Sequence, residues 1–326
     1  MGNYILKRAL LALPTLLVVS MVTFFVIELP PGDFLTSYVA QLRASGDYLD
    51  QVQIDKLRER YGLDRPVYER YYKWMAGIAR GDFGYSLEWK KPVRELIGDR
   101  VLLTLILTAT TMLATWLVAI PIGVLSATKQ YSFADHLTTT FGFIGLGTPG
   151  FLLALVVMFL AYRYLGSNVS GFFSPDFQNA TWSWARIVDL LKHLWLPVLV
   201  LGVNGTAGLI RTMRANLLDE LHKPYVETAR AKGLRERRLL WKYPVRLALN
   251  PFVSSAGWML PQLFSGATIV SVVLSLPTVG QMLLRSLQSQ DMYLAGSLLL
   301  VISVLTILGT FVSDIALGLM DPRIRF

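Results

Sequence analysis

The 326-residue chain contains no cysteine, which excludes disulfides, thiolate metal sites, iron–sulfur clusters and a cysteine nucleophile. Charged residues are also scarce: they make up 16% of the chain, whereas a soluble protein carries about a quarter. Hydrophobic residues make up 53%, and the mean hydropathy is +0.47. We therefore predict a protein whose surface is solvated largely by lipid.

Motifs for catalysis and nucleotide binding are absent as well. The chain has no G-x-x-x-x-G-K-[ST] phosphate loop, no G-x-S-x-G and no H-E-x-x-H. Its three histidines, His136, His193 and His222, are not spaced as metal ligands. We expect no enzyme activity, no metal site and no cofactor bound by this chain.

Long stretches without charge recur six times. Each is long enough, or nearly so, to cross a bilayer as a helix of about 20 residues, and a helix pairs its own backbone groups in lipid. None shows the alternation of a lipid-facing strand. We predict an all-α integral membrane protein with six transmembrane helices. Three of the predicted spans extend beyond the uncharged stretch to take in charged residues at one end; the spans are 9–28, 101–128, 137–162, 194–215, 252–276 and 294–317.

The distribution of basic residues predicts the orientation. With both termini in the cytoplasm, the inner segments carry 15 Lys and Arg, and the outer ones carry 4 when the long segment after the first span is excluded. Long segments cross largely regardless of charge. We predict an external cap over 29–100 and a cytoplasmic loop over 216–250. The first span is interpreted as an uncleaved anchor, because it does not end in small residues. The net charge of +9 is attributed to anionic headgroups rather than to nucleic acid.

The spans hold few groups that could bind an ion, which disfavours an ion-coupled carrier. Asn204 is a candidate for lining a path or for bonding to a neighbouring helix. Most hydroxyl and amide groups in the spans are expected to bond to their own helix or face a neighbour. They are Thr108, Thr110, Thr111, Thr115, Ser254, Ser255, Gln262, Ser265 and Thr268.

The loop over 216–250 carries a short helix signal. Pro224 begins it and Gly233 follows it, the usual asymmetry of helix ends. Its small apolar face, Tyr225, Val226 and Ala229, suits a groove on a protein partner. The alternative, an amphipathic segment on anionic lipid, fits 235–246 better.

This segment resembles the E-A-A-x-x-x-G coupling motif of bacterial ABC importer permeases, with Thr228 in place of the first alanine. The resemblance is to the oligopeptide/dipeptide/nickel permease family, and it extends along the chain in four further matches. They are Tyr61-Gly62-Leu63-Asp64-Arg65-Pro66, Gly81-Asp82-Phe83-Gly84-Tyr85-Ser86, Ile120-Pro121-Ile122-Gly123-Val124 and Asp321-Pro322-Arg323-Ile324-Arg325.

The resemblance implies a type I ABC importer permease fold and a B-type subunit. It implies a second homologous permease, two ATPase domains that hold the ATP and Mg, and an extracytoplasmic solute-binding protein. The residues implied to dock on the ATPase are Tyr225, Val226, Glu227, Thr228, Ala229, Arg230, Ala231, Lys232 and Gly233. Asp321, Pro322 and Arg323 would form a second cytoplasmic element.

Within the cap, the pattern predicts helices over 51–61 and 66–78, followed by a turn at Gly81, Asp82, Phe83 and Gly84. By resemblance this turn is a candidate docking point for the binding protein; equally, the cap could simply cover the outer mouth. The family's solutes are peptides, nickel chelates and oligosaccharides, and spans without acidic or His ligands disfavour a bare metal ion. We expect uptake of a peptide or oligosaccharide-type solute. The alternatives are a stand-alone carrier or channel and an intramembrane enzyme.

Overall fold

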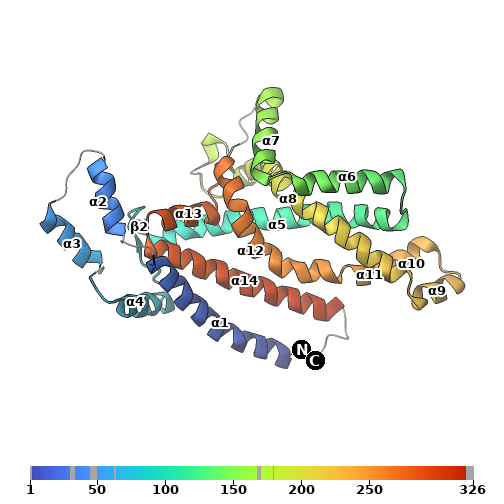
Figure 1. Ribbon diagram of the computed structural model, residues 1–326, viewed down its shortest axis with the longest axis horizontal. Helices are drawn as coiled ribbons and strands as arrows, with labels where there is room; N and C mark the ends of the chain where they lie inside the picture. Colours follow the sequence, from blue (N-terminus) through green and yellow to red (C-terminus); the bar gives the residue numbers. More distant parts are fainter. Residues whose placement is uncertain are drawn as a thin grey trace. The chain divides into compact units, whose positions relative to one another are not determined.

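The computed structural model describes residues 2–29, 34–44, 50–61, 64–166, 170–178 and 180–320. These residues are almost entirely helical (Figure 1). They form two compact units. Unit 1 consists of Leu105–Pro277 and Thr306–Phe326, and unit 2 consists of Gly2–Thr104 and Thr278–Leu305. Helices α5 (Val93–Thr128) and α14 (Met292–Met320) have one end in each unit.

Unit 2 begins with a long apolar helix and continues into short elements. Its core packs Phe24 on Tyr71 and Trp74, whose ring centroids lie 5.3 and 5.7 Å from that of Phe24. Trp74 is 3% exposed, so the cap is a folded structure. The elements of the unit are α1 (Gly2–Glu28), α2 (Phe34–Ala44), α3 (Gln51–Tyr61), α4 (Val67–Ala79), β1 (Tyr85–Ser86), β2 (Lys91–Pro92) and α13 (Val279–Gln288).

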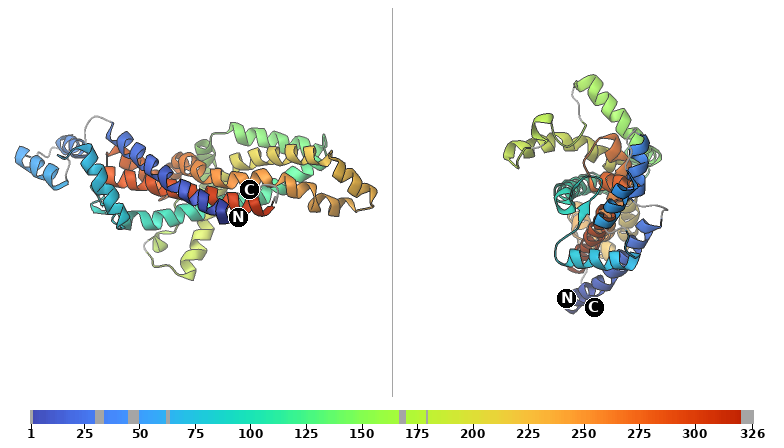
Figure 2. Two further views of the ribbon diagram at one scale, coloured as in Figure 1. Left: turned by 90° about the horizontal axis from the view of Figure 1, so that it is seen from below. Right: turned by 90° about the vertical axis from the view of Figure 1, so that its left-hand side faces the viewer.

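Unit 1 is organised around one long helix, α8 (Trp184–Leu221), and α6 runs alongside it in the views of Figures 1 and 2. Small residues allow the close approach: a Cβ on Gly145 of α6 would lie 2.9 Å from Val203 Cγ1 on α8. The remaining elements are α6 (Phe133–Gly147), α7 (Gly150–Leu165), a 3-10 turn (Pro175–Phe177), α9 (Pro224–Ala231), α10 (Glu236–Lys242), α11 (Pro244–Ala248) and α12 (Asn250–Val273).

The predicted span 137–162 is not one helix. It is divided between α6 and α7, which meet at an angle of 103°. The break lies at Thr148, whose backbone is extended (φ −91°, ψ 120°), and at Pro149. A proline disfavours helical geometry in the residue before it and donates no backbone hydrogen bond, so the prediction of a single helix is corrected.

Four helices in the described residues, α1, α5, α8 and α14, are long and apolar enough to cross a membrane; the bent pair α6–α7 raises the number to five. The predicted span 252–276 falls mostly on α12, in which the side chains of 258–266 lie outside the description. A total of six spans therefore stays a prediction.

Other differences concern the predicted loops. Helix α8 begins at Trp184 and ends at Leu221, so it takes up part of the predicted outer segment and the first residues of the loop over 216–250. The predicted helices over 51–61 and 66–78 correspond to α3 and α4, while α2 was not predicted. The all-α expectation also missed a small antiparallel hairpin, in which Tyr85 pairs with Pro92 and Ser86 with Lys91.

Candidate functional site

Helix α9 follows almost directly on the end of α8 (Figure 1). Glu220, in the last turn of α8, fixes the start of α9 through two contacts. Its carboxylate accepts a hydrogen bond from the Tyr225 hydroxyl at 2.7 Å and pairs with Lys223 Nζ at 2.5 Å. Burial and this carboxylate raise the pKa of Tyr225, so the hydroxyl keeps its proton. A movement of α9 is thereby tied to the end of α8.

The other end of α9 closes at Gly233. The Gly233 N–H donates to Arg230 O at 3.0 Å, and the Leu234 N–H donates to Ala229 O at 3.3 Å. Gly233 has φ +76°, a conformation that side chains with a Cβ rarely adopt. A Cβ placed there would meet nothing within 4 Å. The requirement for glycine thus comes from the backbone alone, and the site around it is open.

A salt bridge connects α9 to α10. Arg230 Nε lies 2.5 Å from Glu236 Oε1, and Nη2 lies 3.3 Å from Oε2. This two-point contact lowers the pKa of the Glu236 carboxyl. Both side chains are about half exposed, so the contact orients the two short helices more than it stabilises them.

The burial of the two faces of α9 differs from the expectation. Val226 is fully buried, and Tyr225 and Ala229 are half-buried, so the apolar face is turned into the chain. The surface left open is polar and includes Glu227 and Thr228. Periodicity placed Tyr225, Val226 and Ala229 on one face of α9 but did not show that the chain itself would bury this face at Val226.

A buried ionic cluster, not found from the sequence, holds α8 near this end. Asp135 on α6 accepts hydrogen bonds from Arg214 Nε and Nη2 at 3.1 and 3.0 Å. It also accepts hydrogen bonds from Ser126 Oγ on α5 and from Tyr131 N at 2.9 Å. The Ser132 cap before α6 was the one local signal for it, because capping places Asp135 in the first turn. The cluster joins α5, α6 and α8.

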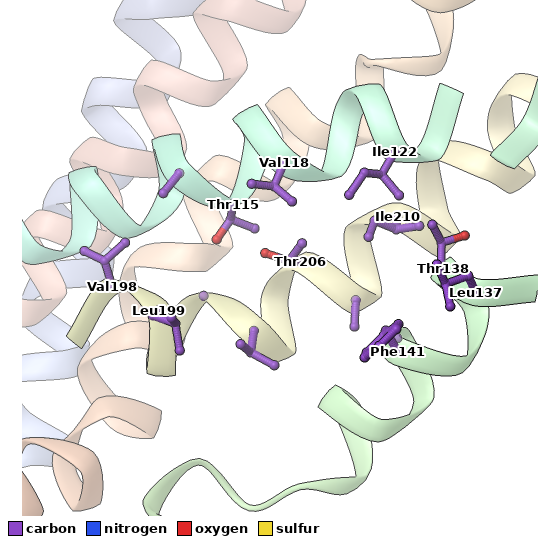
Figure 3. A pocket seen from close by; sticks show the side chains of 15 residues that line it. Thr115, Val118, Ile122, Leu137, Thr138, Phe141, Val198, Leu199, Thr206 and Ile210 are labelled. Carbon is purple, nitrogen blue, oxygen red and sulfur yellow. The ribbon is translucent and has the colours of Figure 1, made fainter. Parts of the chain in front are cut away.

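A hollow of about 530 Å³ lies between the same three helices. Figure 3 shows Thr115, Val118 and Ile122 of α5, Phe141 of α6 and Thr206 of α8 at its wall. Thr138 supplies the third hydroxyl of an otherwise apolar lining. Such a surface suits hydrocarbon better than a polar solute.

A second hollow in unit 1, of about 550 Å³, is more polar. It is lined by Thr111 and Thr115 of α5, Asn204 of α8 and Ser255 of α12, among others. Asn204 is exposed in it. This is the part of the described structure that best matches the expected lining of a path.

Most hydroxyls in the spans were expected to bond to their own helix or to face a neighbour. Some of them do bond to their own helix, and others do not. Thr110 donates to Leu107 O at 3.3 Å and Ser255 donates to Phe252 O at 2.8 Å. Thr111 and Thr115 are buried with no hydrogen-bond partner for their hydroxyls in the described part of the chain. The side chains of Gln262 and Ser265 lie outside the description.

The predicted turn at 81–84 is built into unit 2. Gly81 and Gly84 have φ of +80° and +83°, and a Cβ on Gly84 would lie 2.8 Å from Tyr293 Cδ1. Asp82 Oδ1 accepts the Gly84 N–H at 2.9 Å, and Phe83 O accepts the Ser297 hydroxyl at 3.3 Å. These contacts explain the turn structurally, and docking there stays a prediction. Asp321, Pro322 and Arg323 lie outside the described residues.

Comparison with known families places these features in a class. Residues 119–326 match the family of binding-protein-dependent transport system inner membrane components, and residues 1–108 match the N-terminal part of such components. The chain belongs to this family, and it is therefore a membrane permease subunit of a transport system rather than an enzyme. The resemblance to oligopeptide/dipeptide-type ABC permeases is thereby confirmed.

Individual relatives match over the whole length. The chain is 34% identical to the oligopeptide transport system permease protein AppB of Bacillus subtilis, over 100% of both chains. It is 32% identical to the inner membrane ABC transporter permease protein YejB of Escherichia coli O157:H7, over 100% of this chain and 99% of the relative. It is 30% identical to the glutathione transport system permease protein GsiC of Escherichia coli K12, over 100% of both.

Proposed function

We propose that this chain forms half of the translocation path of an ATP-driven importer for peptides, and that α9 is the element on which a partner ATPase acts. The observation that carries the proposal is the construction of α9. It is a short helix with a buried apolar face, an exposed polar face and a glycine-only turn, joined to the end of a 38-residue helix. A force applied to the exposed face of such an element is transmitted to the long helix α8 that precedes it.

The partners follow from the same proposal. A second, homologous permease completes the path, two ATPase domains bind ATP and Mg, and a solute-binding protein delivers the solute from outside. Both termini and α9 then lie on the cytoplasmic side, as the distribution of basic residues predicts. The names of the relatives AppB and GsiC favour a peptide as the solute. A stand-alone carrier, the alternative, requires no such partners.

The test is Gly233→Val in the complete transporter, reconstituted in liposomes with its ATPases and binding protein. A β-branched residue at φ +76° is strained, so the turn after α9 must change. We expect ATP-driven uptake to fall at least tenfold while the amount of assembled complex is unchanged.

The matched control is Gly166→Val. Gly166 also follows a helix, at φ +63°, with nothing within 4 Å of an added Cβ, so it carries the same backbone strain away from α9. Equal loss in both variants, or normal uptake in Gly233→Val, would contradict a coupling role for α9. Uptake by the purified chain without any ATPase would support the carrier instead.

A further inference from the structure

In unit 2, two arginines lie against the same indole ring. Arg100 Cζ lies 5.2 Å from the centroid of Trp89 and Arg285 Cζ lies 5.7 Å from it. Trp89 belongs to the tip of the β1–β2 hairpin, Arg100 to the second turn of α5, and Arg285 to α13. The hairpin, the start of α5 that follows it and the distant helix α13 thus bring two guanidinium groups to one aromatic ring.

A buried carboxylate holds the hairpin tip that carries Trp89. Asp291, fully buried, accepts the Ser86 hydroxyl at 2.6 Å and the Glu88 N–H at 3.2 Å. Ser86 Oγ in turn accepts a hydrogen bond from the backbone N–H of Trp89 at 3.1 Å. Asp291 therefore fixes the hairpin tip, and its oxygens are occupied by these donors rather than by an arginine.

Neither guanidinium has an acidic partner in the part of the chain that the structure describes. Across the described residues, no carboxylate lies within 4.0 Å of Arg100 or Arg285, although Glu88, Glu95 and Asp99 are close in the sequence. No hydrogen bond from either guanidinium to a protein acceptor is found there either. A guanidinium carries five N–H donors, and stacking on a ring leaves its edge free to bind a carboxylate at two points. The two arginines are thus oriented on the ring with no acceptor from the described residues.

The burial of these three side chains favours a small anion as their ligand over a flat protein surface. Trp89 and Arg100 are half-buried, while Arg285 is exposed, so one guanidinium lies partly below the surface and the other is accessible from it. All three residues belong to segments that the basic-residue count predicts to be external, or to the outer end of a span. We propose that Arg100 and Arg285 bind the C-terminal carboxylate of a peptide on its way into the path. This inference rests on the proposed function.

The test compares peptides that have a free C-terminal carboxylate with the same peptides amidated. The probes are two equimolar mixtures of alanyl peptides of two to five residues, one free and one amidated, offered to the complete reconstituted transporter and quantified by mass spectrometry. The binding protein is the same in wild type and in every variant, so its preference cancels in the ratio of variant to wild-type uptake of each mixture, and the ratio isolates the permease. Arg100→Gln and Arg285→Gln are each compared with wild type.

We expect each variant to lower uptake of the free peptides about tenfold, the effect of one charge-assisted contact, and to change uptake of the amides less than twofold. The matched control is Arg94→Gln, an exposed arginine six residues earlier in α5 that stacks on no aromatic ring among the described residues. Trp89→Phe, which keeps an aromatic platform, should retain more free-peptide uptake than Trp89→Ala.

Equal losses for free and amidated peptides would overturn the inference and indicate a structural role, a lipid headgroup or an acidic residue of the binding protein. An effect of Arg94→Gln as large as the others would overturn it as well. If the wild-type transporter takes up neither mixture in an ATP-dependent way, the proposed peptide importer fails and the inference fails with it. Normal wild-type uptake with unaffected variants removes only the inference.

Discussion

Arg214 of α8 donates to both carboxylate oxygens of Asp135 on α6, at 3.1 and 3.0 Å. The two side chains differ in exposure: that of Asp135 is 5% exposed and that of Arg214 is 30% exposed. The carboxylate therefore depends on its partner more than the guanidinium does. This asymmetry leads to a prediction about which half of the pair matters more for stability.

Arg214→Gln leaves a buried carboxylate without its cation, and we expect it to lower the free energy of unfolding by about 3 kcal/mol. Asp135→Asn leaves an arginine that still reaches solvent, so its cost should be smaller. Thermal unfolding of the detergent-solubilised chain, followed by tryptophan fluorescence, measures both. The double variant should cost less than the sum of the two, and additive costs would contradict a direct coupling.

Two glycines of α5 should respond in opposite ways to alanine. A Cβ on Gly123 would lie 2.5 Å from Met213 Cβ and 2.7 Å from Met213 Cγ, whereas one on Gly98 meets nothing within 4 Å. We expect Gly123→Ala to destabilise by about 1–3 kcal/mol through overpacking. Gly98→Ala should stabilise by about 0.5–1 kcal/mol, because glycine is unfavourable inside a helix. The same unfolding assay tests both, and equal effects would contradict the close α5–α8 contact.

The bridge between α9 and α10 should weaken in acid. The pKa of Glu236 is lowered from its usual 4.5 by Arg230, so its stabilising contribution is present above about pH 4.5 and is lost as the pH falls through the lower, folded-state pKa. Hydrogen exchange of the backbone from Ala229 to Glu236, corrected for intrinsic rates, should show greater protection than in Glu236→Gln at pH 7. The two proteins should become equal in stronger acid; a difference that persists there would contradict the assignment.

The unpartnered hydroxyls of α5 give a prediction for the second hollow. Thr111 and Thr115 are 1% and 2% exposed, and a buried hydroxyl without a partner costs about 1–3 kcal/mol. Thr111→Val should therefore raise the free energy of unfolding. Thr110→Val is the control, since the Thr110 hydroxyl already donates to the helix backbone and its removal should bring no gain. The thermal unfolding assay described above measures both variants, and a loss of stability in Thr111→Val would contradict the prediction.

Local signals were enough to predict some elements. Pro224 and Gly233 mark the two ends of α9. Both signals are local, because the proline ring fixes φ of its own residue and glycine readily takes the positive φ that follows a helix. The apolar period likewise predicted α3, whose bounds match. Contacts between residues that are far apart in the sequence could not be predicted from it. Asp135 and Arg214 are 79 positions apart, and the shared platform of Arg100, Trp89 and Arg285 depends on how three segments meet. The bend at Thr148 was missed because hydropathy does not register backbone geometry.

The length of α8 has a mechanical consequence. Its 38 residues extend for about 57 Å, nearly twice the roughly 30 Å of hydrocarbon in a bilayer. A single helix, in which Pro197 lacks the backbone N–H of the ladder, is thus much longer than the lipid is thick and is followed almost directly by α9. A tilt of about 5° about the far end moves the end next to α9 by roughly 5 Å, by the geometry of a rod of this length. Under the coupling role proposed for α9, the helix would act as a lever arm, because a short displacement at α9 would become a small rotation among the packed helices.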